Sequence, residues 1–146
     1  MTSLSILSGR FLLGLYFFVP GLMKLSAPSQ TLAYMQSHDI AFAWTLLWLA
    51  AASNILGGLC LMAGRHVKLV AYASALYVLL VNLILHDFWT MQGDSVAHET
   101  QNFIKNLGIL AGLLVLAGYA PSRPLSLSKF WQSDAVIADS QSQECG

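Results

Sequence analysis

The stretch VKLVAYASALYVLLVNLILHDF, residues 67–88, decides the fold of this chain. Its Lys68 and Asp87 stand next to its two ends, and apolar residues dominate between them. An α-helix needs about 20 mostly apolar residues to cross the hydrocarbon core of a bilayer. The stretch therefore predicts a transmembrane helix.

Three further stretches have the same character, namely Leu4–Leu25, Ile40–Met62 and Phe103–Ala120. Of the 146 residues, 56 % are hydrophobic and 10 % are charged, whereas a soluble domain has about 25 % charged residues. Such a chain lacks the polar side chains to cover a surface in water. We predict an all-α polytopic membrane protein, with a four-transmembrane-helix bundle over residues 1–120 and a mostly disordered cytoplasmic tail over residues 121–146.

Polar segments connect the predicted helices. Ser26–Asp39 is predicted to be a polar loop, a short link follows at Arg65, and Asp87–Asn102 is predicted to be a longer loop. His98 and Glu99 belong to that longer loop, where we expect both side chains to be solvated.

The basic residues predict the orientation of the bundle. With four crossings, the side that holds both termini carries Arg10, Arg65, Lys68, Arg123 and Lys129. The other side carries only Lys24 and Lys105. Because cytoplasmic loops are enriched in Lys and Arg, we predict a multi-pass protein of the plasma (inner) membrane with both termini in the cytoplasm.

Charge and cysteine content exclude some classes of function. The formal net charge is zero, so the chain offers no basic surface for nucleic acid. Cys60 and Cys145 form neither a disulfide framework nor a metal-binding spacing. We therefore expect the lipid bilayer as the main partner, and no metal site.

A layer of polar residues is predicted at the outer ends of the helices. It consists of Lys24, Asn82, His86, Asp87, Trp89, Asn102, Lys105 and Asn106. Lys105 and Asn106 lie inside an otherwise apolar helix, where polar side chains need partners and often mark functional sites. The alternative is an interfacial role, with tryptophan in the aromatic belt, lysines anchoring helix ends and amides capping helices.

This outer cluster has the chemistry of a small binding site. His86 can change its charge near neutral pH, Asp87 is expected to orient it, Lys105 supplies a cation and Trp89 a flat face. Together they suit a quinone head group, a small oxyanion or a proton. The sequence contains no evident cofactor motif, and a quinone is the one cofactor that these residues suggest.

Arg10 and Asn54 are predicted to form a polar pair inside the membrane. Counted at about 1.5 Å per residue from the outer helix ends, both side chains lie roughly 20 Å deep. A hydrogen bond between them would offset part of the free energy of burying an arginine in lipid. The alternative is that Arg10 extends to the inner headgroups without a partner.

Several short motifs resemble the DoxX family of small four-helix membrane proteins. They are RFLLG at residues 10–14, Gly21 with Lys24, the glycines between Gly57 and Gly64, HDFW at residues 86–89 and NFIKNL at residues 102–107. The resemblance covers about residues 10–128 and is most specific in the last two motifs. One departure is Asn54, where the family commonly has an acidic residue.

The resemblance implies a membrane protein linked to redox and stress physiology, since some relatives are subunits of a thiosulfate to quinone oxidoreductase. Three hypotheses follow. In the first, the chain belongs to a quinone-linked redox system, as a subunit of a membrane oxidoreductase, and His86, Lys105 and Trp89 contact the quinone. In the second, it is an accessory or assembly subunit, bound to a redox partner protein or to copies of itself. In the third, Arg10 and Asn54 extend the outer cluster into a pathway for protons or small solutes.

Overall fold

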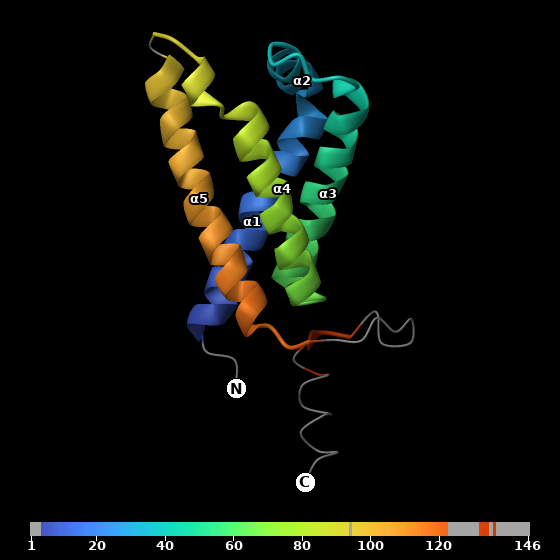
Figure 1. Ribbon diagram of the computed structural model, residues 1–146. Coiled ribbons are helices and arrows are strands. Elements are labelled where there is room, and N and C mark those ends of the chain that lie inside the picture. The colour runs from blue at the N-terminus through green and yellow to red at the C-terminus, as the bar shows by residue number, and fades with distance from the viewer. Residues whose placement is uncertain (1–3, 94, 123–131, 135, 137–146) are drawn as a thin grey trace.

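The computed structural model describes residues 4–93, 95–122, 132–134 and 136, and this part of the chain contains helices and no strands (Figure 1). In chain order the elements are α1 (Leu4–Ser26), α2 (Pro28–Gln36), α3 (Ala43–Ala63), α4 (Val67–Leu85), the short 3-10 helix η1 (Phe88–Thr90) and α5 (Ser95–Tyr119). Helices α1, α3, α5 and α4 with η1 are long and apolar enough to cross a membrane. The predicted four-helix membrane bundle is thus confirmed.

The bundle has two ends, which we call the α2 end and the tail end. The α2 end carries α2 and the connection between α4 and α5 (Figure 1). The tail end carries the N-terminus of α1 and the link between α3 and α4 (Figure 1). The predicted outer cluster belongs to the α2 end.

Helices α1 and α3 cross at two glycines. A Cβ atom on Gly14 would lie 2.7 Å from the carbonyl oxygen of Gly58, and a Cβ on Gly58 would lie 2.6 Å from the carbonyl oxygen of Gly14. No larger residue fits at this distance, because the obstacle is backbone on both sides. Close approach of this kind provides the packing that holds helices together in lipid, where apolar side chains have no preference for each other.

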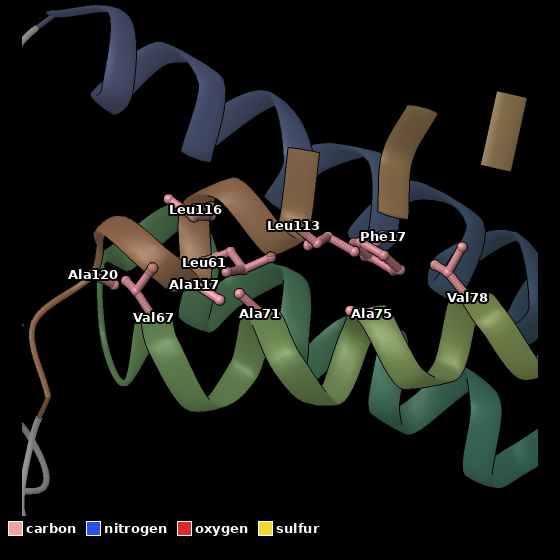
Figure 2. Packing of buried hydrophobic residues seen from close by; sticks show 10 residues of the cluster. All are labelled: Phe17, Leu61, Val67, Ala71, Ala75, Val78, Leu113, Leu116, Ala117 and Ala120. Carbon is pink, nitrogen blue, oxygen red and sulfur yellow. The ribbon is translucent and has the colours of Figure 1, made fainter. Parts of the chain in front are cut away.

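Helices α4 and α5 pack through one apolar cluster that also includes side chains from α1 and α3 (Figure 2). Its buried members are Phe17, Leu61, Val67, Ala71, Ala75, Val78, Leu113, Leu116, Ala117 and Ala120. Most of them belong to the half of the bundle nearer the tail end. Polar side chains gather at the α2 end instead.

The predicted polar loop Ser26–Asp39 contains a helix, so that prediction was wrong. Pro28 occupies the first turn of α2, where its missing N–H leaves no hydrogen bond unmade. Leu32 and Met35 then face the same side, and Met35 is buried against α3. The short helix therefore has an apolar face that only two of its side chains supply.

Helix α5 begins at Ser95, not at Phe103 as predicted. The predicted loop Asp87–Asn102 thus contains both η1 and the first turns of α5. Glu99, expected in a solvated loop, is only 8 % exposed. The hydropathy of this segment is low because polar residues occupy both its exposed face, with His98 and Gln101, and its inward face, with Glu99 and Asn102.

Part of the predicted disordered tail is anchored, and most of the rest lies outside the described residues. The Asp134 carboxylate accepts hydrogen bonds from the backbone N–H groups of His66, at 3.1 Å, and Val67, at 2.8 Å. Its own N–H donates to the carbonyl of Gly64 at 2.9 Å. Asp134 therefore caps the N-terminus of α4 from a distant position in the sequence.

Candidate functional site

A histidine and a carboxylate meet at the α2 end. His86 directly follows α4, and its Nδ1 lies 2.6 Å from Oε2 of Glu99 in α5. The side-chain amide of Asn102 donates to the same oxygen at 3.3 Å. Glu99 therefore fixes the orientation of the imidazole and leaves Nε2 as the ring nitrogen available to a ligand. The prediction that Asp87 orients His86 was wrong.

Asp87 faces a different histidine. Its Oδ1 lies 3.7 Å from Nε2 of His38, and its Oδ2 accepts a hydrogen bond from the Thr90 hydroxyl at 2.7 Å. The His38 Nε2 and the Asp87 Oδ1 are both buried, and neither has a hydrogen-bond partner among the described residues. The two atoms attract each other when His38 is protonated.

Tyr34 connects α2 to the end of α4. Its hydroxyl donates a hydrogen bond to the carbonyl of Leu85 at 2.7 Å. Burial, together with the charge and hydrogen bonding of nearby Glu99, raises the pKa of Tyr34 to about 12. Tyr34 therefore remains a neutral donor at physiological pH and keeps α2 in place beside the Glu99 carboxylate.

Three side chains form a polar ladder across α1, α4 and α5. The Tyr16 hydroxyl donates to Oδ1 of Asn106 at 3.1 Å, and the Asn106 amide donates to Oδ1 of Asn82 at 3.1 Å. The Asn82 amide in turn donates to the carbonyl of Phe103 at 3.2 Å. Asn82 is 1 % exposed, so the partners that the sequence required for it are supplied inside the bundle.

Two adjoining cavities lie beside this ladder. The larger, about 510 Å³, is lined by Tyr16, His86, Asn102, Lys105, Asn106, Gly108 and Ile109. The smaller, about 180 Å³, adds Lys24 of α1 and Asn54 of α3 to the shared residues Tyr16, His86 and Asn106. Five members of the predicted outer cluster thus line these two adjoining cavities: Lys24, His86, Asn102, Lys105 and Asn106.

The remaining members of that cluster lie elsewhere. Asn82 is buried behind the ladder, and Asp87 faces His38. The Trp89 ring is 54 % exposed and packs edge-on against Phe88 and Phe103, and it lines neither cavity. This position suits a tryptophan in the interfacial aromatic belt.

Arg10 and Asn54 are not partners, and that prediction was wrong. The Arg10 guanidinium lies directly over Gly64, in the place that a side chain there would take. Asn54 precedes Gly64 by ten residues, about 15 Å along a helix. It is buried beside Gly21, and its side chain interacts with Tyr77. Counting depth from helix ends missed the register that the Gly14 and Gly58 contact imposes.

Sequence reasoning also missed residues that shape the site, above all Glu99, Tyr34, Tyr16 and His38. A signal for Glu99 was present, because Glu99, Asn102 and Asn106 follow a spacing of three and four residues and so share one helix face. This pattern can be recognised only if the helix is predicted to begin before Phe103. No comparable pattern marks Tyr34 or His38, which reach the site through the fold of α2.

The DoxX family profile matches residues 5–87, which is more than half of the chain. The chain belongs to the DoxX family. A curated relative, the inner membrane protein YphA of Escherichia coli (strain K12), is 27 % identical over 116 residues, covering 80 % of this chain and 83 % of YphA. No solved structure matches the chain. The DoxX match covers α1 to α4 and ends at Asp87, so the α5 side of the site, including Glu99, lies beyond it.

Proposed function

We propose that this DoxX protein is a component of a quinone-linked redox or stress-response system and that the two adjoining cavities hold the quinone head group. One observation carries the proposal. His86 lines both cavities, while its Nδ1 is occupied by buried Glu99. A histidine oriented in this way presents Nε2 to a ligand oxygen and can give or take a proton there.

The other cavity residues suit the same ligand. Asn102 and Lys105 place N–H donors along α5, and Lys24 adds a second cation from α1. Donors on both sides of a flat head group can reach its two carbonyl oxygens. A bound quinone would supply the electron chemistry, and the residues of this chain would bind it, orient it and hold a proton on His86. The electrons would come from a partner protein.

A pathway for protons or small solutes is less well supported. The polar ladder ends at Tyr16, and the apolar cluster begins at the neighbouring Phe17. Beyond it, Leu61 and Leu113 are fully buried and continue toward the tail end. An ion crossing here would leave its polar partners before it reached Arg10, at a high free-energy cost.

We place the protein in the inner membrane with both termini in the cytoplasm, so that the α2 end faces outward. The four apolar helices and the inner membrane location of YphA support the membrane assignment. The surplus of Lys and Arg at the tail end supports the orientation. A reporter fused after Glu144 should be active in the cytoplasm. Activity only outside the cytoplasm would mean that the bundle has the opposite orientation.

The deciding experiment measures binding of decylubiquinone to the purified protein in nanodiscs, by quenching of tryptophan fluorescence. We expect saturable binding that His86→Ala and Lys105→Met each weaken about ten-fold, the loss of one hydrogen bond from a charged donor. His98→Ala, an exposed histidine of α5, and Lys68→Met, a lysine at the tail end, are matched controls that should bind normally. Absence of saturable binding by the native chain would reject the proposal in favour of an accessory subunit.

A further inference from the structure

The larger cavity opens on the side of the bundle. Its wall is made by α1 and α5, and Tyr16, Lys105 and Gly108 in that wall are all exposed. Helix α1 packs chiefly on α3, and α5 packs chiefly on α4. The seam between α1 and α5 is therefore loosely packed, as is the seam between α3 and α4, and the cavity lies along the seam between α1 and α5.

The opening lies at the depth of the lipid chains. Phe103 packs against Trp89, whose position suits the interfacial aromatic belt. Counted at about 1.5 Å per residue from Phe103, Gly108 lies about 8 Å deeper along α5, inside the hydrocarbon core of about 30 Å, and Asn102 and Lys105 lie nearer the α2 end. A molecule at Gly108 reaches the cavity from lipid and not from water.

Gly108 leaves the cavity wall without a side chain at this point. A Cβ atom there would meet no heavy atom within 4 Å. The fold therefore does not require glycine at this position, in contrast to Gly14 and Gly58, where backbone lies in the way. Glycine is also a poor helix former. Its presence leaves a gap in the wall where any larger side chain would stand.

Polarity changes along the cavity. Its part nearest the α2 end has His86, Asn102 and Lys105, which can bind polar oxygens. Its part nearest the membrane centre has Gly108 and Ile109, which offer no polar side chain. A ligand that fits both parts has a polar head and an apolar chain.

We infer that the ligand of this site is an amphipath that enters from the lipid phase, with its apolar chain passing over Gly108. The inference rests on the proposed function, because it assumes that the cavity holds a head group. It narrows the ligand class to long-chain quinones and excludes a small oxyanion or a water-soluble quinone as the ligand. Gly108 is then a specificity-determining residue that accommodates the chain.

The test compares decylubiquinone with its chain-free parent quinone, in nanodiscs, for the native chain, Gly108→Leu and Gly118→Leu. Gly118 is the matched control, because it is also exposed on α5, a Cβ there also meets nothing within 4 Å, and it lines none of the cavities at the α2 end. After correction for partition into lipid, the native chain should bind decylubiquinone more tightly. Gly108→Leu should lower the affinity for decylubiquinone about ten-fold. It should lower the affinity for the chain-free quinone clearly less. Gly118→Leu should change neither affinity.

Different failures have different meanings. If the native chain binds both quinones equally well, or Gly108→Leu binds decylubiquinone normally, the inference is overturned and the proposed function stands. If the native chain binds neither quinone, both the inference and the proposed function are rejected. A quinone with a photoreactive group on its chain tests the native chain without any substitution. Its cross-links should fall on α5 around Gly108, and cross-links confined to α3 would overturn the inference.

Discussion

Nδ1 of His86 lies 2.6 Å from Oε2 of Glu99, which joins the end of α4 to the first turns of α5. This distance is typical of a charge-assisted hydrogen bond. Both side chains are largely shielded, with 16 % and 10 % of their surfaces exposed. The contact therefore has two consequences, because it stabilises the α2 end and it determines which nitrogen of His86 meets a ligand.

Removing the carboxylate should destabilise the protein. We expect Glu99→Ala to lower the free energy of unfolding by about 2 kcal/mol, because Nδ1 of His86 and the Asn102 amide lose their acceptor. Glu99→Gln, which keeps an acceptor oxygen, should lower it by about half as much. Thermal unfolding in nanodiscs measures both changes. Gln101→Ala, an exposed neighbour on α5, is the control, and an equal loss in that variant would refute the structural role of Glu99.

The polar ladder should show coupling between its members. Asn82→Leu leaves the Asn106 amide N–H without its acceptor and removes the second donor to the Phe103 carbonyl. We therefore expect a loss of about 1 kcal/mol, as for other hydrogen bonds between membrane helices. Asn106→Leu should behave similarly. Because each substitution removes the same contact, the double variant should lose less than the sum of the two. Strict additivity in the thermal unfolding data would mean that the two amides do not interact.

These interactions show why part of the site was predictable. Lipid chains offer no hydrogen bonds, so the side chains of Asn82 and Asn106 need hydrogen-bond partners within the bundle. Both residues are predicted at a similar depth in the membrane, so each can be the partner of the other. The partner of His86 was not predictable in the same way. Asp87 is its neighbour in sequence, but η1 directs the Asp87 carboxylate toward α2, and the early start of α5 brings Glu99 to His86 instead.

The fold was predictable where bilayer thickness alone determines it. The four spans follow from hydropathy, since a helix of fixed rise must cross a core of fixed thickness. Helix α2 does not cross the membrane, and its apolar face is too short to stand out from a polar loop. The register of α1 on α3 depends on backbone contact at Gly14 and Gly58, and for this reason depth counting placed Arg10 beside the wrong residue.

Tyr34 should hold α2 against the end of α4. Its hydroxyl donates to the Leu85 carbonyl at 2.7 Å, so Tyr34→Phe removes one hydrogen bond, and we expect a loss of about 1 kcal/mol in the local stability of α2. Hydrogen exchange of the α2 amides should then be about five-fold faster. Tyr119→Phe, on an exposed tyrosine of α5, is the control that should leave this exchange unchanged.

This effect of Tyr34 should not depend on pH in the neutral range. Because the pKa of Tyr34 is raised to about 12, the hydroxyl keeps its proton and its hydrogen bond between about pH 6 and about pH 9. The ratio of the exchange rates of Tyr34→Phe and the native chain should therefore stay constant over this range. A ratio that fell with rising pH would mean that Tyr34 loses its proton there, and equal rates in the two proteins would mean that this hydrogen bond does not hold α2.

The cap on α4 should contribute measurably to stability although it comes from the tail. Asp134→Ala removes the acceptor for the N–H groups of His66 and Val67, and caps of this kind contribute about 1 kcal/mol. Asp134→Asn, which keeps one acceptor oxygen, should lose less. Gln101→Ala, on an exposed residue of α5 with no side-chain hydrogen bond among those described, is again the control. If thermal unfolding of Asp134→Ala matched that of the native chain, the tail would not be held at the link between α3 and α4, and α4 would have to begin without this cap.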